Sequence, residues 1–173
     1  ISLGRGGDDL DCTSPICLTI ENVDSETLDI YMINQAGCSY CSDPNYITSE
    51  MCALMENEWI FEAGMDESSC QDRPGKYYNG EISGLQFELF GITISGATGG
   101  LTEDASFTVS TSETSILAFS MTGGTIGEGE GVLTTVEFSN LEGNNICFGN
   151  NSDLGTATNN AFADTTSDCN GPC

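Results

Sequence analysis

Residues 81–100 read EISGLQFELFGITISGATGG, and residues 105–139 read ASFTVSTSETSILAFSMTGGTIGEGEGVLTTVEFS. Within this stretch, four short runs alternate between apolar and polar residues, and clusters of Gly, Ser and Thr separate them. The apolar positions of the four runs are Ile82, Leu85, Phe87 and Leu89, then Phe107 and Val109, then Ile116, Leu117 and Phe119, and finally Val132, Leu133, Val136 and Phe138. A period of two places apolar side chains on one face of a strand, which a second sheet has to cover. The stretch therefore predicts an all-β fold, a β-sandwich.

Further strand-like runs flank this stretch. Residues 17–20 (CLTI) and 28–33 (LDIYMI) predict an opening hairpin, because the Asn, Asp and Ser residues between them favour a turn. Residues 146–148 (ICF) predict another strand, and residues 161–163 predict a last short one.

Residues 35–80 have a different character and predict a small disulfide-rich insertion between two sandwich strands. A short helix is expected at about residues 49–60 within it, capped by Thr48 or Ser49. Its apolar positions recur three and four residues apart, at Met51, Leu54, Met55 and Trp59. The insertion is too small to bury a core, so its own crosslinks are expected to hold it together.

The chain of 173 residues is most simply one domain with decorated ends. Residues 1–16 are rich in Gly, Asp and Ser and predict an N-terminal arm or linker. The sandwich is expected over residues 17–165, with the insertion at 35–80, and residues 166–173 form a cysteine-bearing tail. The chain begins with Ile1 and has no cationic segment followed by an apolar one, which indicates a processed product.

Several segments resemble the cohesin family. They are LTIENVDSETLDIYMIN (18–34), ISGLQFELFGITISG (82–96), ILAFSMTGGTI (116–126) and GEGVLTTVEF (129–138). Cohesins are secreted β-sandwich modules that bind dockerins, and the resemblance, over residues 17–34 and 81–149, implies a jelly-roll topology. The cysteine-rich insertion departs from the ordinary cohesin pattern. No residues match a dockerin-contacting face, so the resemblance carries over the fold and not dockerin binding.

The charge of the chain excludes several classes of function. Its formal net charge is −24, and its only basic residues are Arg5, Arg73 and Lys76. Binding to nucleic acid or to anionic lipid is not expected, because both need clustered Lys and Arg.

No apolar run is long enough to span a bilayer, so membrane insertion is not expected. The chain has no His, so it cannot build a Ser-His-Asp or Cys-His catalytic site. We expect that the protein is not an enzyme.

Nine cysteines indicate an oxidising, extracellular or cell-surface location. Four of them, Cys38, Cys41, Cys52 and Cys70, are expected to form two disulfides in the insertion. A zinc site made of these four cysteines is the alternative, although the wide spacing of the second pair fits zinc poorly. Cys12 is expected to pair with Cys17 or with a cysteine of the insertion. The remaining three, Cys147, Cys169 and Cys173, would supply one bridge and an odd thiol. We hypothesise that Cys173 or Cys12 links the chain to another copy or another chain.

Three kinds of binding or modification site are candidates. Asn150 begins the sequon Asn-Asn-Ser in a Gly/Asn-rich loop, which is a setting for N-glycosylation. No cofactor is expected, and calcium is the alternative; its candidate ligands are the acidic residues Asp8, Asp9, Asp11, Glu128 and Glu130. Tyr77 and Tyr78 are candidates for stacking against a glycan.

The sequence predicts an extracellular structural or interaction module. We expect it to assemble with copies of itself or with another secreted protein, as in a filament or a surface layer, because no catalytic set is present and the ends carry cysteines. A carbohydrate-binding or adhesion module is the alternative. A calcium-dependent receptor for a dockerin-like partner is a further one.

Overall fold

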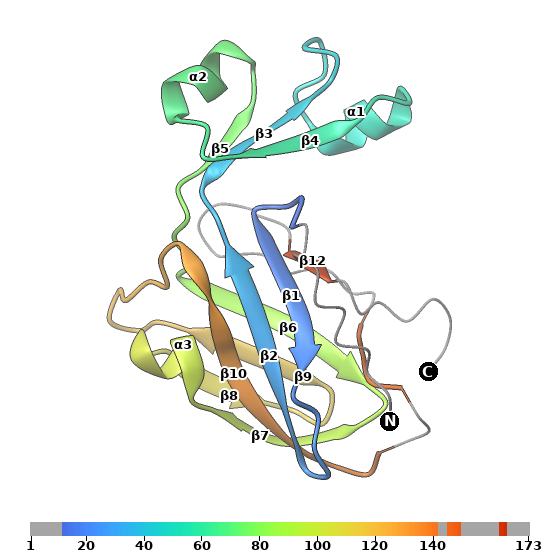
Figure 1. Cartoon of the computed structure of the whole chain (residues 1–173), viewed down its shortest axis with the longest axis vertical. Coiled ribbons are helices and arrows are strands. Elements are labelled where there is room, and N and C mark those ends of the chain that lie inside the picture. Colours follow the sequence, from blue (N-terminus) through green and yellow to red (C-terminus); the bar gives the residue numbers. More distant parts are fainter. Residues whose placement is uncertain (1–11, 142–144, 150–162, 166–173) are drawn as a thin grey trace.

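The computed structural model describes residues 12–141, 145–149 and 163–165 (Figure 1). The chain folds as a sandwich of two sheets with a smaller, third sheet at one end. The first sheet has the strand order β12-β1-β2-β10-β7. Its strands are β1 (Ile16–Glu21), β2 (Thr27–Asn34), β7 (Thr93–Thr98), β10 (Gly129–Ser139) and β12 (Ala163–Thr165).

The second sheet covers the first and has the order β11-β6-β9-β8. Its strands are β6 (Gly84–Phe90), β8 (Thr108–Thr111), β9 (Ser115–Phe119) and β11 (Cys147–Phe148). From β6 onward the chain passes repeatedly between the two sheets, as a jelly roll requires. Neighbouring strands are antiparallel, except that β12 lies parallel to β1 at the sheet edge. The predicted all-β sandwich is confirmed.

Alternation along the strands fills the space between the sheets. In β2, every second residue is buried, so that Leu28, Ile30 and Met32 enter the core. From the facing sheet, Phe87 of β6 is buried and meets Phe148 of β11 edge to face, with ring centroids 5.9 Å apart. The core is therefore built from the runs that the sequence marks as alternating.

The opening hairpin is confirmed as β1 and β2, and the four alternating runs lie in or beside β6, β8, β9 and β10. One detail of the third run is wrong: Leu117 points outward and is 41% exposed, and its neighbour Ala118 is fully buried. The ICF strand is confirmed as β11. The last strand begins at Ala163 and runs to Thr165, so it is placed later than expected, and residues 161 and 162 lie outside the described residues.

Two elements of the sandwich were not predicted. Strand β7 contains Gly, Ser and Thr beside few apolar residues, and it pairs with the last residues of β10. Helix α3 (Gly100–Asp104) follows it and packs against β10. Gly100 has a φ of 66°, and a Cβ there would collide with the carbonyl oxygen of Val132. Glycine at this position therefore allows the helix to approach the strand closely.

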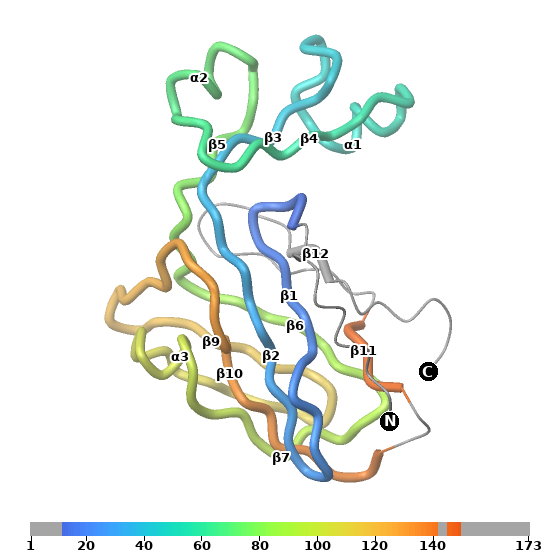
Figure 2. The backbone as a smooth tube through the Cα atoms, viewed as in Figure 1, coloured from blue at the N-terminus to red at the C-terminus, as the bar shows by residue number. Residues whose placement is uncertain are grey.

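The insertion forms a third sheet with the order β4-β3-β5 and two short helices. Its elements are β3 (Gly37–Cys41), α1 (Ser49–Leu54), β4 (Trp59–Ala63), α2 (Glu67–Asp72) and β5 (Lys76–Tyr78). The tube in Figure 2 runs from the end of β2 directly into β3 and returns from β5 to β6. The insertion thus projects from one end of the sandwich on two adjacent chain segments.

The predicted helix at residues 49–60 is half right. Helix α1 does begin there, and the hydroxyl of Thr48 accepts a hydrogen bond from the amide of Met51, at 3.3 Å. It ends at Leu54, however, and Trp59 opens strand β4. A positive φ of 58° at Glu56 turns the chain after the helix, so the helical spacing of Met51, Leu54, Met55 and Trp59 does not reflect one continuous helix.

Candidate functional site

Two disulfides hold the insertion, as predicted. Cys38 and Cys41 lie three residues apart in β3, so their side chains point to opposite faces of the small sheet. Cys38 is bonded to Cys70 of α2, and Cys41 is bonded to Cys52 of α1, with Cα–Cα distances of 5.5 and 5.8 Å. One helix is thereby fixed to each face. Because all four sulfurs are in disulfides, a zinc site of four thiolates is excluded at these residues.

The other cysteines are partly accounted for. Cys12 is bonded to Cys17, one of the two expected partners, so it does not link the chain to another copy. Cys147 is disulfide-bonded as well. Cys169 and Cys173 lie outside the described residues, and the hypothesis of an interchain bridge through Cys173 stays a prediction.

A buried polar network fixes the insertion to the sandwich. The side-chain amide of Asn34, at the end of β2, donates hydrogen bonds of 2.8 Å to the carbonyl oxygens of Gly80 and Gly127. Its oxygen accepts a hydrogen bond of 2.8 Å from the hydroxyl of Tyr78. Burial raises the pKa of Tyr78 far above its usual range, so this hydroxyl keeps its proton and acts as a donor. The network joins the segment that leaves the sandwich to the segment that returns.

The burial of Tyr78 bears on one candidate role, the stacking of Tyr77 and Tyr78 against a glycan. Tyr78 is only 3% exposed, and Tyr77 and Tyr78 point to opposite faces of β5. They therefore cannot form a common platform for stacking against a glycan, and Tyr78 has a structural role instead.

Two of the calcium candidates, Glu128 and Glu130, lie within the described residues and line the same cavity. Glu128 uses one carboxylate oxygen to accept a hydrogen bond of 2.7 Å from the amide of Ala36. A cavity of about 290 Å³ lies between α3 and the start of β10, and Asp104, Glu128 and Glu130 line it. Even so, the described residues contain no group of three or more metal-ligating side chains that could hold an ion. Asp8, Asp9, Asp11 and the sequon residue Asn150 lie outside the described residues.

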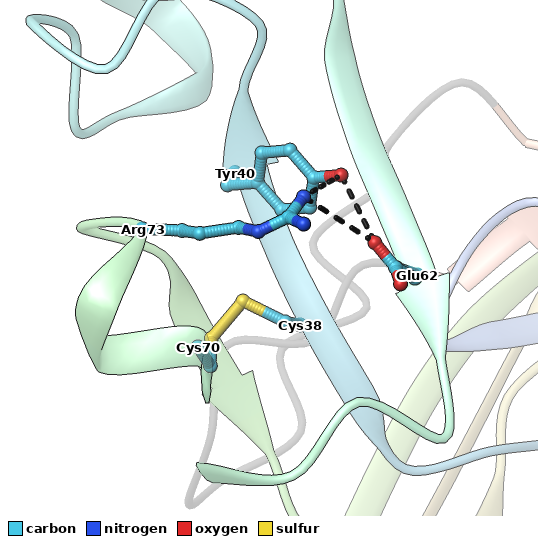
Figure 3. A network of polar contacts seen from close by, with 5 residues as sticks. All are labelled: Cys38, Tyr40, Glu62, Cys70 and Arg73. Carbon is cyan, nitrogen blue, oxygen red and sulfur yellow. Dashed lines mark hydrogen bonds and ion pairs between the residues drawn. A yellow bond between two sulfur atoms is a disulfide. The ribbon is translucent and has the colours of Figure 1, made fainter. Parts of the chain in front are cut away.

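One face of the insertion carries a polar cluster (Figure 3). Arg73, at the end of α2, lies over the ring of Tyr40 with its guanidinium carbon 5.0 Å from the ring centroid. It also donates to the Tyr40 hydroxyl at 2.8 Å and forms an ion pair of 3.5 Å with Glu62 of β4. Both charged side chains are about half exposed, at 52% and 50%, so solvent weakens the pair. The cluster sits beside the Cys38–Cys70 disulfide, where it helps to fix α2 against the sheet.

The opposite helix, α1, presents an apolar surface to solvent. We define the α1 patch as Ile47, Met51, Leu54 and Met55, whose side chains are between 47% and 75% exposed. The only buried residue of the helix is Cys52, which is fully covered. The described part of the chain has eight large exposed apolar side chains, and the α1 patch supplies half of them within nine residues. This clustering makes the α1 patch a candidate contact site.

The sequence had singled out most of these positions for a different reason. The spacing of Met51, Leu54 and Met55 predicted a helix, and only the structure shows that these side chains are turned to solvent. A partial signal was Cys52: a disulfide turns Cys52 to the sheet, and Leu54, two residues further along the helix, then lies on the opposite side.

No protein-family model, curated protein or solved structure matches this chain. Within the described residues, no helix is both long enough and apolar enough to cross a membrane.

Proposed function

We propose that this chain is an extracellular structural and interaction module that uses the sandwich as a scaffold and the insertion as its contact surface. It assembles with copies of itself or with another secreted protein, and a filament or surface-layer subunit is the specific form we favour. The α1 patch is the observation that carries this proposal, because it leaves four large apolar side chains in water at the end of the molecule that projects farthest from the core.

The rest of the molecule supports the same role. The disulfides Cys12–Cys17, Cys38–Cys70 and Cys41–Cys52 are compatible with an oxidising extracellular environment. The two-sheet sandwich is compatible with the resemblance to cohesins, whose modules serve in assemblies. The insertion is held by covalent bonds, so it can present apolar side chains without needing them for its own core.

Self-assembly is tested by sedimentation velocity and electron microscopy on the full chain. Copies with a net charge of −24 repel one another at about 0.1 M salt, where the Debye length is about 10 Å, and much less at about 1 M, where it is about 3 Å. If copies assemble through the α1 patch, association rises with salt and disappears in the variant Leu54→Ser/Met55→Ser.

The matched control is Leu117→Ser/Met121→Ser, which removes two exposed apolar side chains from the sandwich instead. Association that survives the patch variant would place the contact elsewhere. A chain that stays monomeric at both salt concentrations would exclude the self-assembling form and leave only assembly with another protein.

A further inference from the structure

The α1 patch has the geometry of a docking surface on a rigid support. Met51, Leu54 and Met55 are spaced three and four residues apart, so their side chains lie on one side of the helix turn. The helix itself is fixed from below by the Cys41–Cys52 disulfide and at its start by the Thr48 cap. An apolar surface that is already in place can bind a partner without first being ordered.

The patch is also adaptable in shape. Two of its four side chains are methionines, which are unbranched and polarizable and can adjust to differently shaped apolar partners. Leu54 is the most exposed member, at 75%, and offers the largest apolar area for a partner to cover.

The segment that carries the patch is strongly acidic. Residues 42–58 contain four acidic residues and no basic one, namely Asp43, Glu50, Glu56 and Glu58. Hydrogen bonds from its own amide and from the Thr48 hydroxyl lower the pKa of Glu50, so it is ionised at neutral pH. Of the basic residues, Lys76 lies near Glu50, and Arg73 is paired with Glu62 by the other helix. An apolar surface is therefore bordered by excess negative charge.

Charge complementarity distinguishes among the possible binding partners of the α1 patch. A second copy of the chain carries the same acidic segment and a net charge of −24, and the two copies repel each other at ordinary salt. An anionic lipid surface is repelled for the same reason. A segment with apolar side chains at helical spacing, flanked by Lys and Arg, matches both the apolar centre and the acidic border.

We propose that the α1 patch is the docking site for a cationic amphipathic helix of a partner protein. This inference rests on the proposed interaction function and gives the chemistry of the partner. The apolar side chains of the partner's helix cover Leu54 and the two methionines. Its basic side chains lie against Glu56, Glu58 and the neighbouring carboxylates.

The test uses the full chain and a synthetic peptide of Leu and Lys, about 18 residues long, with Leu at helical spacing. One comparison peptide has the same composition in an alternating order, and another replaces Lys by Glu. The reporter is Trp59, the only Trp of the sequence, which begins β4 and pairs across the sheet with Cys41, the residue crosslinked to α1. Its fluorescence and isothermal titration calorimetry give two independent binding curves.

We expect the helically spaced Leu/Lys peptide to bind at least about tenfold more tightly than the alternating peptide, because only the former buries a continuous apolar stripe. The Leu/Glu peptide should not bind. Leu54→Ser/Met55→Ser should weaken binding by about tenfold or more, and Leu117→Ser/Met121→Ser should leave it unchanged. A thermal melt of each variant checks that the fold is intact.

The ionic part of the contact is tested separately. Raising the salt concentration should weaken binding, and Glu56→Gln/Glu58→Gln should reduce that salt dependence. The matched control, Glu103→Gln/Glu113→Gln on the sandwich, removes the same charge elsewhere and should change it less.

Equal binding of the helical and alternating peptides, or an unchanged affinity in the patch variant, would overturn the proposal and leave only general attraction between opposite charges. Self-association through the patch that grows with salt, without peptide binding, would mean that the partner is a second copy; the proposed function would then stand and the inferred partner would be wrong. Failure of both assays would refute both.

Discussion

Replacing Asn34 by Ala should destabilise the protein strongly, because this one side chain connects the sandwich to the insertion. It is 2% exposed and makes three hydrogen bonds of 2.8 Å, to Gly80, Gly127 and Tyr78. Each such bond contributes about 1 kcal/mol net, so Asn34→Ala should cost about 3 kcal/mol. For a chain of this size that corresponds to a fall in Tm of roughly 6–12 °C.

The comparison variant is Tyr78→Phe, which removes only the hydroxyl and should cost about 1 kcal/mol. Both are measured by urea unfolding without reducing agent, so that the disulfides stay intact, and the double variant completes a thermodynamic cycle. We expect the double variant to cost less than the sum of the single ones, because the two residues share a bond.

Gly80 also lies at the junction between the sandwich and the insertion. It has a φ of 78°, and a Cβ there would collide with the side chain of Glu128, which accepts a hydrogen bond from the Ala36 amide.

Two results would refute the role given to Asn34. One is a cost of less than about 1 kcal/mol for Asn34→Ala, and the other is full additivity of its effect with that of Tyr78→Phe.

Three further outcomes are expected. Replacing both Cys41 and Cys52 by Ala removes a crosslink with a sequence separation of 11, which should lower the free energy of unfolding by about 2–3 kcal/mol. Hydrogen-exchange protection should be lost in α1 and kept by the amides of the sandwich, so a uniform loss of protection would contradict this expectation. Thr19→Val should stabilise the protein by about 1 kcal/mol in chemical denaturation, because the buried Thr19 hydroxyl has no hydrogen-bond partner among the described residues, whereas Thr108→Val at an exposed site should change little. The Ser69 amide and the hydroxyls of Ser68 and Ser69 lower the pKa of Asp66 from 3.8 to about 2. Because the folded pKa lies below the unfolded one, the carboxylate stabilises α2 at neutral pH, and this contribution is lost as the pH falls from about 4 to about 2. An NMR titration should show the low pKa of Asp66. Asp66→Asn should remove the contribution of this carboxylate to the pH dependence of stability.

Predicting the sandwich from the sequence worked where a strand has one buried and one exposed face. Runs such as Leu85, Phe87 and Leu89 alternate because solvent and core lie on opposite sides of β6, and that pattern is local. It failed for β7, because the two buried apolar residues of this strand, Ile94 and Ala97, lie three positions apart rather than two. It also failed for Leu117, because nothing in the sequence says that the small residue Ala118 is the one that points inward.

The candidate site was harder to predict than the fold. The four cysteines of the insertion indicated two disulfides, and the structure supplies the pairing. The network around Asn34 was missed, because it joins residues up to 93 positions apart and no local pattern marks them. Tyr78 was noticed for its ring, and its burial shows that its hydroxyl matters more.

The sequence by itself determined the all-β class, the place of the insertion and the reliance on disulfides, because alternation, composition and cysteine count are properties of the chain as written. Only the tertiary structure decided which way α1 faces. The helical spacing of Met51, Leu54 and Met55 is the same whether that face packs inward or meets solvent. The Cys41–Cys52 bond turns Cys52 to the sheet and leaves the apolar side chains outside, so a pattern typical of a core becomes a surface.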